Sequence, residues 1–176
     1  MKTKFIFIIL TFIIIFVNNS FSQIEEKTVE AAQAIYLYNI TRNVDWNNSD
    51  KNKTEFVISV IGSNFAFTEI KKYMEGKFVA TKPIKVLYVK TLDELKESQI
   101  VYFSSNKYKL IPEVQNKFNN INILYVTEMN GALKNGSCIN FYMEEDKLKF
   151  EINQENIKNQ KLRITLSLIT SAKPQN

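Results

Sequence analysis

Small polar residues, clustered carboxylates and one thiol are the features of this sequence that could do chemistry. Gly62-Ser63-Asn64 and Ser104-Ser105-Asn106 each follow a short apolar segment, and Glu144-Glu145-Asp146 places three carboxylates side by side. Cys138 is the only cysteine, and the sequence has no histidine. Because histidine is the commonest general base and the commonest zinc ligand, the composition disfavours both kinds of site.

The carboxylates at residues 144–146 allow two interpretations. Two carboxyl groups can act as general acid and general base if burial separates their pKa values. The polar sequence around them instead favours a solvated hairpin turn. No glycine-rich phosphate loop and no G-x-S-x-G nucleophile turn occurs in the sequence. We therefore expect no catalytic residue, no metal and no cofactor, and an enzyme is the least favoured of three hypotheses.

The polar residues that follow the apolar segments form the candidate ligand site. In open α/β sheets, ligands bind outside the carboxyl ends of the strands. There, Gly62, Ser63, Asn64, Ser104, Ser105 and Asn106, with Thr127 as a further candidate, could bind a small polar solute or an anion. The same residue types are also the ordinary choice for turns and helix N-caps, so both interpretations stay open.

The elements that must position these residues alternate between strand and helix. We expect strands at residues 56–61, 84–89, 100–103 and 121–126, and helices at residues 65–75 and 108–118, with a short helix opened by a capping box at residues 91–94. Gly76 fits the end of the first of these helices. Several strands are apolar on both faces, which predicts a mostly parallel sheet covered by helices on both sides, a three-layer sandwich.

The C-terminal part of the chain follows a different pattern. Apolar and polar residues alternate over residues 139–144 and 148–152, on either side of Glu145-Asp146, which predicts an antiparallel hairpin at the sheet edge. Cys138 precedes this hairpin, and we interpret it as a buried inert thiol, with an intermolecular disulfide as the alternative. Residues 162–172 fit a helix or a strand, and we favour the helix.

The opening helix, predicted over residues 24–44, carries most of its apolar residues on one side. Those residues are Val29, Ala32, Tyr36, Leu37, Ile40 and Val44, and the opposite side holds Glu30, Gln33, Asn39 and Arg42. Such a helix can cover one face of the sheet. Ile35 and Tyr38 point away from that side, and exposed apolar residues often mark contact with another chain, so these two form the candidate interaction surface.

The first residues have the three-part layout of a secretory signal. Lys2 and Lys4 precede an uncharged apolar block from Phe5 to Val17, and small residues follow before a cleavage site between Ser22 and Gln23. We expect residues 1–22 to be a cleaved signal peptide and residues 23–176 a single domain, with an uncleaved membrane tether as the alternative. Cleavage lowers the formal net charge from +5 to +3. This mild, scattered charge argues against nucleic-acid binding.

Several stretches together resemble the YfiR-like periplasmic family. They occur in the family's order and spacing across nearly the whole mature chain, at residues 33–39 with 44–46, 60–62, 100–104, 135–141 and 150–153. The most specific are the Y-N and V-[DE]-W motifs around the opening helix, Tyr38-Asn39 and Val44-Asp45-Trp46, and the closing F-E-I-N motif, Phe150-Glu151-Ile152-Asn153.

The resemblance implies a periplasmic, non-enzymatic protein of Rossmann-like α/β fold that forms a homodimer. Such a protein would bind the extracytoplasmic sensor part of an inner-membrane signalling protein, of the diguanylate cyclase or histidine kinase type, and control its activity. Redox-linked disulfides of the family do not carry over, because this chain has Ser98 and a lone Cys138. The second hypothesis is a periplasmic small-ligand-binding protein that uses the strand-end turns.

Overall fold

The computed structural model describes residues 29–46, 53–119 and 122–173. The predicted signal peptide, with Ser22 and Gln23 at its cleavage site, lies outside these residues. The main sheet has seven strands in the order β3-β4-β2-β5-β6-β7-β8. They are β2 (Phe56–Ile61), β3 (Phe78–Val79), β4 (Lys82–Val89), β5 (Ile100–Phe103), β6 (Leu124–Thr127), β7 (Ile139–Glu144) and β8 (Lys147–Ile152).

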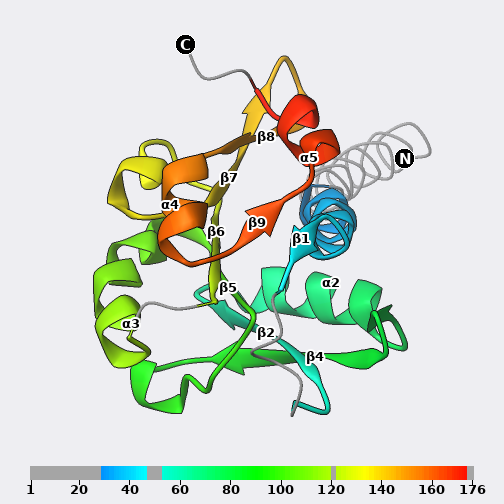
Figure 1. Cartoon of the computed structure of the whole chain (residues 1–176), viewed down its shortest axis with the longest axis vertical. Helices are drawn as coiled ribbons and strands as arrows, with labels where there is room; N and C mark the ends of the chain where they lie inside the picture. Colours follow the sequence, from blue (N-terminus) through cyan, green and yellow to red (C-terminus); the bar gives the residue numbers. More distant parts are fainter. Residues whose placement is uncertain (1–28, 47–52, 120–121, 174–176) are drawn as a thin grey trace, which may run out of the picture.

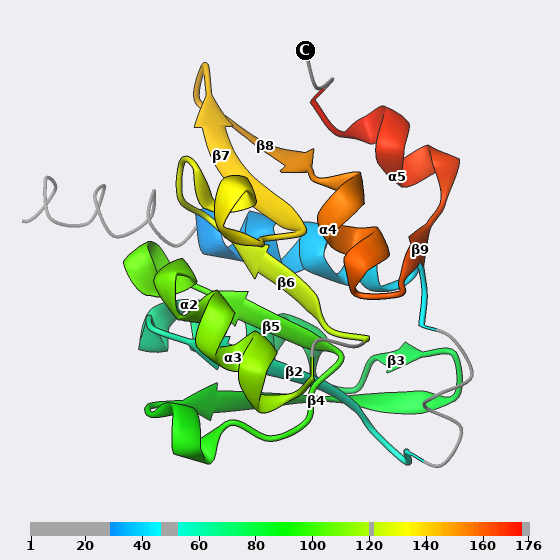
Figure 2. The same cartoon turned by 60° about the vertical axis from the view of Figure 1, so that its left-hand side comes forward.

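The pairing within this sheet confirms a mixed α/β fold with a mostly parallel sheet. Parallel pairs join β4 to β2, β2 to β5, β5 to β6 and β6 to β7. Only the border strands β3 and β8 run antiparallel to their neighbours. The antiparallel hairpin at the sheet edge is therefore where the alternating sequence predicts it. The sheet is curled in Figures 1 and 2, and a flat three-layer Rossmann-like sandwich is not confirmed.

Helices lie on both sides of the curled sheet. The longer ones are the N-terminal helix, described over residues 29–41, and α2 (Asn64–Met74). Shorter ones are α3 (Ile111–Lys117), α4 (Gln154–Asn159) and α5 (Leu166–Ser171), with 3₁₀ turns η2 (Leu92–Glu94), η3 (Ser105–Leu110) and η4 (Ala132–Asn135). In both views, α3 and α4 lie on one side of the sheet, and the N-terminal helix and α2 lie on the other (Figures 1 and 2).

The core forms where the strands are apolar on both faces. All four residues of β5 and all four of β6 are buried, so side chains from both faces of these central strands pack under helices. Leu37 and Ile40 of the N-terminal helix are buried on the sheet. Trp46 continues this contact, with its ring 4.9 Å from that of Phe56 and its indole N–H donating to the Thr41 carbonyl at 2.8 Å.

The helix ends agree only in part with the sequence signals. Ser63 caps α2 by accepting a hydrogen bond from the Ala66 N–H, and Gly76 follows the helix with φ of +73°. The predicted capping box at residues 91–94 does not form as expected. Thr91 makes no side-chain cap hydrogen bond, and Glu94 accepts from the Lys90 N–H instead, so the segment makes one 3₁₀ turn.

Three further expectations need correction. Gln33, expected on the polar side of the opening helix, is buried, and Tyr36, expected on the apolar side, is exposed at its flank. The helix expected at residues 108–118 is a 3₁₀ segment that continues into the seven-residue α3, with Pro112 in its first turn. The segment at residues 162–172 is divided between strand β9 (Arg163–Ile164) and α5.

The strand β9 pairs with residues near the start of the chain. It runs antiparallel to β1 (Val44–Asp45), which directly follows the N-terminal helix. Arg163 forms an ion pair with Asp45 at 2.6 Å, and the Thr165 N–H donates to the Asn43 carbonyl at 3.0 Å. The two ends of the described chain are thereby joined in a clasp formed by β1 and β9.

Candidate functional site

The two predicted strand-end turns lie against each other in the structure. Because β2 and β5 are neighbouring parallel strands, their carboxyl ends meet, and the Ser63 N–H donates to the Ser104 hydroxyl. Gly62 sits in this contact with φ of +115°, and a Cβ added there would lie 2.5 Å from Ser104 Oγ. Gly62, Ser63 and Ser104 therefore lie together at the carboxyl ends of β2 and β5.

The contacts of these residues are those of turns and caps. Ser104 is buried, its hydroxyl is engaged by Ser63, and Ser63 caps α2. Asn64, Ser105 and Asn106 are exposed. Ser105 has φ of +52°, which is uncommon for a residue other than glycine and directs its N–H toward Glu128. These contacts all lie within the fold, and a ligand role for the six residues stays a prediction.

A serine and a lysine after β5 have a spacing that the sequence analysis passed over. Ser104 and Lys107 form an S-x-x-K pair, the spacing of serine nucleophiles that use a lysine. Here, however, the Ser104 hydroxyl is buried against Ser63, and Lys107 is exposed on the surface. Within the part of the chain that the structure describes, no hydrogen bond joins the two side chains, so a nucleophile and base are not assembled.

Glu128, which follows β6, is the centre of a polar network that the sequence analysis did not identify. Its Oε2 accepts from the Tyr102 hydroxyl at 2.6 Å and from the Gln33 amide at 3.1 Å. Its Oε1 accepts from the Ser105 N–H at 2.7 Å. These contacts join the N-terminal helix to the carboxyl ends of β5 and β6. We call Gln33, Tyr102, Ser105 and Glu128 the Glu128 network.

The environment of Tyr102 suits a structural hydrogen bond. Burial raises the pKa of the Tyr102 hydroxyl well above its usual range, and the adjacent Glu128 carboxylate raises it further. The hydroxyl therefore stays protonated and donates to the carboxylate. Because each Glu128 oxygen has a protein donor, the network holds the N-terminal helix on the sheet.

A second buried network surrounds Thr127 and Asn140 on the other side of the sheet. The Asn140 Oδ1 accepts from the Thr127 hydroxyl at 2.7 Å and from the Met129 N–H at 2.9 Å, while its Nδ2 donates to Glu151 at 2.9 Å. Thr127 also contacts the Ser137 hydroxyl at 2.8 Å. The candidate Thr127 is thus fully engaged in holding the start of the hairpin to β6.

Cys138 is buried, as the sequence predicts. Burial raises the pKa of its thiol to about 12. Because the pKa is raised, the folded protein holds the thiol proton more tightly than the unfolded chain does. The free energy of unfolding therefore falls as the pH rises above the unfolded pKa of the thiol.

We expect a thiol reagent at pH 8 to label Cys138 at the rate of unfolding in native buffer and at once in denaturant. Immediate native labelling would contradict the burial.

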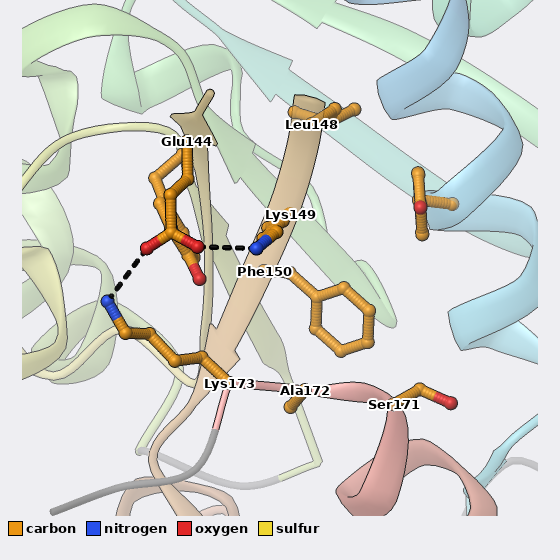
Figure 3. Close-up of a pocket in the computed structure, with 9 residues that line it drawn as sticks. Glu144, Leu148, Lys149, Phe150, Ser171, Ala172 and Lys173 are labelled. Atoms are coloured by element: carbon orange, nitrogen blue, oxygen red, sulfur yellow. Dashed lines mark hydrogen bonds and ion pairs between the residues drawn. The ribbon is translucent and has the colours of Figure 1, made fainter. Parts of the chain in front are cut away.

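The carboxylate cluster forms the solvated turn that the alternation predicts. Glu145 and Asp146 are exposed with φ of +51° and +57°, and Glu144 forms ion pairs with Lys149 and Lys173. Figure 3 shows Glu144 between the two ammonium groups at one wall of an open cavity of about 460 Å³. The ion pairs lower the pKa of Glu144, which disfavours the protonated form that a general acid needs.

The cavity in Figure 3 has one charged wall and one apolar wall. The charged wall is the Glu144 ion-pair cluster, and the apolar wall is formed by Tyr36, Leu148 and Phe150. The Tyr36 ring lies 5.8 Å from that of Phe150. The C-terminal segment lines the cavity and is attached to β8, because the Lys173 N–H donates to the Phe150 carbonyl at 3.0 Å. Nothing in its chemistry indicates catalysis.

Of the candidate interaction surface, Ile35 is exposed and Tyr38 is half-buried. Ile35 is 44% exposed on the side of the helix away from the sheet. The Tyr38 ring packs edge-on against Tyr73, with centroids 6.2 Å apart, and the Lys77 ammonium lies 5.7 Å from the Tyr38 ring. The neighbouring Phe78 is 52% exposed. An apolar and basic surface therefore surrounds Tyr38, although part of its ring belongs to the core.

Residues 29–46, 53–119 and 122–173 contain neither a metal-binding cluster nor a membrane-spanning helix. In these ranges, no group of three or more His, Cys, Asp or Glu side chains is placed to bind a metal ion. No helix within the same ranges has the length and apolar character needed to cross a bilayer.

Fold and site together define an α/β protein in which the polar residues at the strand ends hold elements of the fold to one another. Comparison with protein-family models places the chain more closely: it matches the YfiR/HmsC-like family (DUF4154) over residues 30–173. The chain belongs to this family, which confirms the resemblance seen in the sequence. A search of curated proteins gives no match.

Proposed function

We propose that this protein is an exported, non-enzymatic regulator that binds the extracytoplasmic sensor part of an inner-membrane signalling protein. The partner is of the diguanylate cyclase or histidine kinase type, and binding controls its activity. The observation that carries this proposal is the match to the YfiR/HmsC-like family across residues 30–173. The proposal includes a periplasmic location after removal of residues 1–22 and a homodimeric state.

The described chemistry supports binding rather than catalysis. The carboxylates of Glu128 and Glu144 each have several donors, the Cys138 thiol is buried and protonated, and Ser104 lacks a base. Ile35 and Phe78, by contrast, place large apolar side chains in solvent. Such residues on an otherwise ordinary surface are suited to contact with another chain.

The function is tested by capture from membranes. The tagged mature chain, residues 23–176, is incubated with detergent-solubilised inner membranes, and bound integral proteins are identified. We expect a signalling protein with an extracytoplasmic domain, whose cyclase or kinase output changes when the purified chain is added. Capture of no such protein, or capture without a change in output, would contradict the proposal.

Replacing Ile35 by Glu tests the candidate interaction surface. Because Ile35 is 44% exposed and lies away from the sheet, we expect the free energy of unfolding to change by less than about 0.5 kcal/mol. A charge at the centre of an apolar contact should weaken association at least tenfold. The measurements are urea unfolding and sedimentation or membrane capture of the variant.

Asn39→Glu is the matched control, because Asn39 is an exposed polar residue of the same helix. It adds the same charge without removing an apolar contact, so association should be retained. Tyr38→Glu is less suited, since the Tyr38 ring also packs on Tyr73. Equal binding by wild type and the Ile35 variant would remove Ile35 from the interface.

A small-ligand function is the second proposal, and the cavity in Figure 3 is the observation that favours it. Lys149 and Lys173, whose ammonium groups both pair with Glu144, line the cavity together with Phe150. One positive charge in excess therefore lies beside an apolar side chain, an arrangement suited to an organic anion. A stabilising thermal shift with a small organic anion, lost in Lys149→Ala, would support this function over the first if no membrane partner is captured.

A further inference from the structure

The outer edge of β4 is mostly uncovered. β4 is the second strand from one border of the sheet, and the border strand β3 has only two residues. In this pair, Phe78 lies opposite Pro83 and Val79 opposite Lys82. The remaining residues of β4, 84–89, extend past the end of β3. Most of a long strand is therefore left at the sheet border (Figure 2).

The hydrogen bonds show which backbone groups face outward. The Ile84 N–H donates to the Lys77 carbonyl at 2.9 Å, on the β3 side. Successive strand residues direct their backbone groups to opposite sides, so Val86 and Tyr88 also face outward, and Lys85 and Leu87 face β2. Among the described residues, no backbone hydrogen bond reaches Val86 or Tyr88 from that side. Their N–H and C=O groups form an unpaired row.

The opposite border of the sheet is better protected. β8 forms that border, and the segment after α5 crosses it where the Lys173 N–H donates to the Phe150 carbonyl. Folded proteins usually shield long edge strands, because an open row of N–H and C=O groups can pair with another chain. The exposed row of β4 is therefore an available docking edge.

We propose that the outer edge of β4, from Ile84 to Tyr88, accepts an extended acidic strand of the partner protein. This inference rests on the proposed function, since the strand would come from the extracytoplasmic part of the membrane signalling protein. Backbone pairing with Val86 and Tyr88 supplies affinity, and the flanking side chains supply selectivity.

The charge of the edge determines which strand fits. Residues 82–90 contain three lysines, Lys82, Lys85 and Lys90, and no acidic residue. A second copy paired antiparallel about Val86 would bring the two Lys85 side chains to diagonal positions on one face, where long side chains reach each other, and like charges so placed disfavour the pair. Acidic side chains on an incoming strand would instead lie beside these lysines.

The side chains of β4 suit an added strand as well. Val86 and Tyr88 are half-buried on the side covered by α2, where the Tyr88 ring lies 5.3 Å from that of Phe67. Lys85 emerges on the other face, where it forms an ion pair with Glu55 at 2.9 Å. An incoming strand would therefore meet apolar side chains on one face and the Lys85 ammonium, which has Glu55 as its one carboxylate partner among the described residues, on the other.

Synthetic strands test the proposal. We use fluorescently labelled acetyl-TEVEVEVT-amide and its basic counterpart acetyl-TKVKVKVT-amide, with the mature chain labelled with ¹⁵N. We expect the acidic peptide to bind at least tenfold more tightly by fluorescence anisotropy. It should also shift the amide signals of Val86 and Tyr88 and slow their hydrogen exchange. Equal affinity for the two peptides, or signal changes elsewhere only, would overturn the proposal.

Proline substitutions separate the two sides of the strand. Val86→Pro removes an N–H that faces outward, so the fold should persist and acidic-peptide affinity should fall at least tenfold. Val86→Thr, which keeps the N–H, should bind as wild type does. Leu87→Pro removes an N–H that faces β2 and should lower the thermal midpoint strongly. Equal peptide binding by the Pro and Thr variants at residue 86 would overturn the proposal.

Two further results distinguish this inference from the proposed function. If wild type and Val86→Pro capture the same membrane protein equally well, the docking edge is wrong and the regulatory function stands. If wild type captures no signalling protein, both fail. Self-association of the wild type that protects the Val86 and Tyr88 amides and is lost in Val86→Pro would assign the edge to a second copy and overturn the acidic strand.

Discussion

Gly62→Ala is expected to lower the free energy of unfolding by about 2–4 kcal/mol, because the change adds both a steric clash and backbone strain. The new Cβ would lie 2.5 Å from Ser104 Oγ and 3.0 Å from the Ser104 carbonyl oxygen. Gly62 also has φ of +115°, which side-chain-bearing residues rarely adopt. Urea unfolding followed by circular dichroism measures the loss.

The matched control for this change is Gly76→Ala. Gly76 also has positive φ, +73°, but a Cβ added there meets no atom within 4 Å. Only the backbone strain at positive φ remains, so we expect the free energy of unfolding to fall by about 1 kcal/mol. If the free energy of unfolding falls equally in the two variants, Ser104 can move away from the added Cβ, and the strand-end turns are not tightly packed.

Glu128→Ala should lower the free energy of unfolding by about 1–3 kcal/mol, because the Gln33 amide loses its acceptor and the Tyr102 hydroxyl keeps only the Gln33 Oε1, 3.0 Å away. The Tyr102 hydroxyl and the Gln33 amide are buried, so water does not readily replace the carboxylate. The Ser105 N–H is near the surface and should be rehydrated. The N-terminal helix should lose protection against hydrogen exchange before the central strands do.

Glu144→Ala is the control for this second change. Glu144 also accepts hydrogen bonds from two side chains, those of Lys149 and Lys173, but its ion pairs are exposed to solvent. Exposed ion pairs contribute little to stability, so unfolding should be nearly unchanged. A loss in Glu144→Ala as large as that in Glu128→Ala would contradict the distinction between buried and exposed networks.

The pH dependence of stability provides an independent check of the Glu128 network. Tyr102 has a raised pKa in the folded state, so it stays protonated there when the unfolded chain ionises. The unfolded state then binds fewer protons, and the free energy of unfolding falls as the pH rises above about 10. Tyr102→Phe should reduce this alkaline slope, and an unchanged slope would place its cause elsewhere.

The strands were the most predictable part of the fold. Apolar runs on both faces indicated β2 and β5 with their observed bounds, and strict alternation indicated the β7–β8 hairpin. Such patterns are readable because the faces of a strand that will be buried are apolar within that strand's own sequence. The sequence predicts helices at residues 91–94 and 108–118, but the structure has the 3₁₀ turn η2 at the first and begins the second within η3. Capping residues and apolar spacing do not determine the length or type of a short helix.

The candidate site was predictable only where the topology alone fixes it. Parallel neighbours bring Ser63 and Ser104 together, as the order of β2 and β5 requires. The contacts of Glu128 in this network join residues 23 to 95 positions apart, and its partners depend on which face of each element is buried. Gln33 shows the difficulty: the sequence places this polar residue toward solvent, but it is buried, and its amide donates to the half-buried Glu128 carboxylate.

The clasp between β1 and β9 has a consequence for how the chain reaches its native state. In this pairing, Val44 lies opposite Ile164, which is 164 − 44 = 120 residues further along the chain. At a synthesis rate of roughly 5–20 residues per second, the partner of β1 is made several seconds after the N-terminal helix. The apolar side of that helix must be kept from wrong contacts during this interval, so β1 and β9 can pair only after the strands between them have been made.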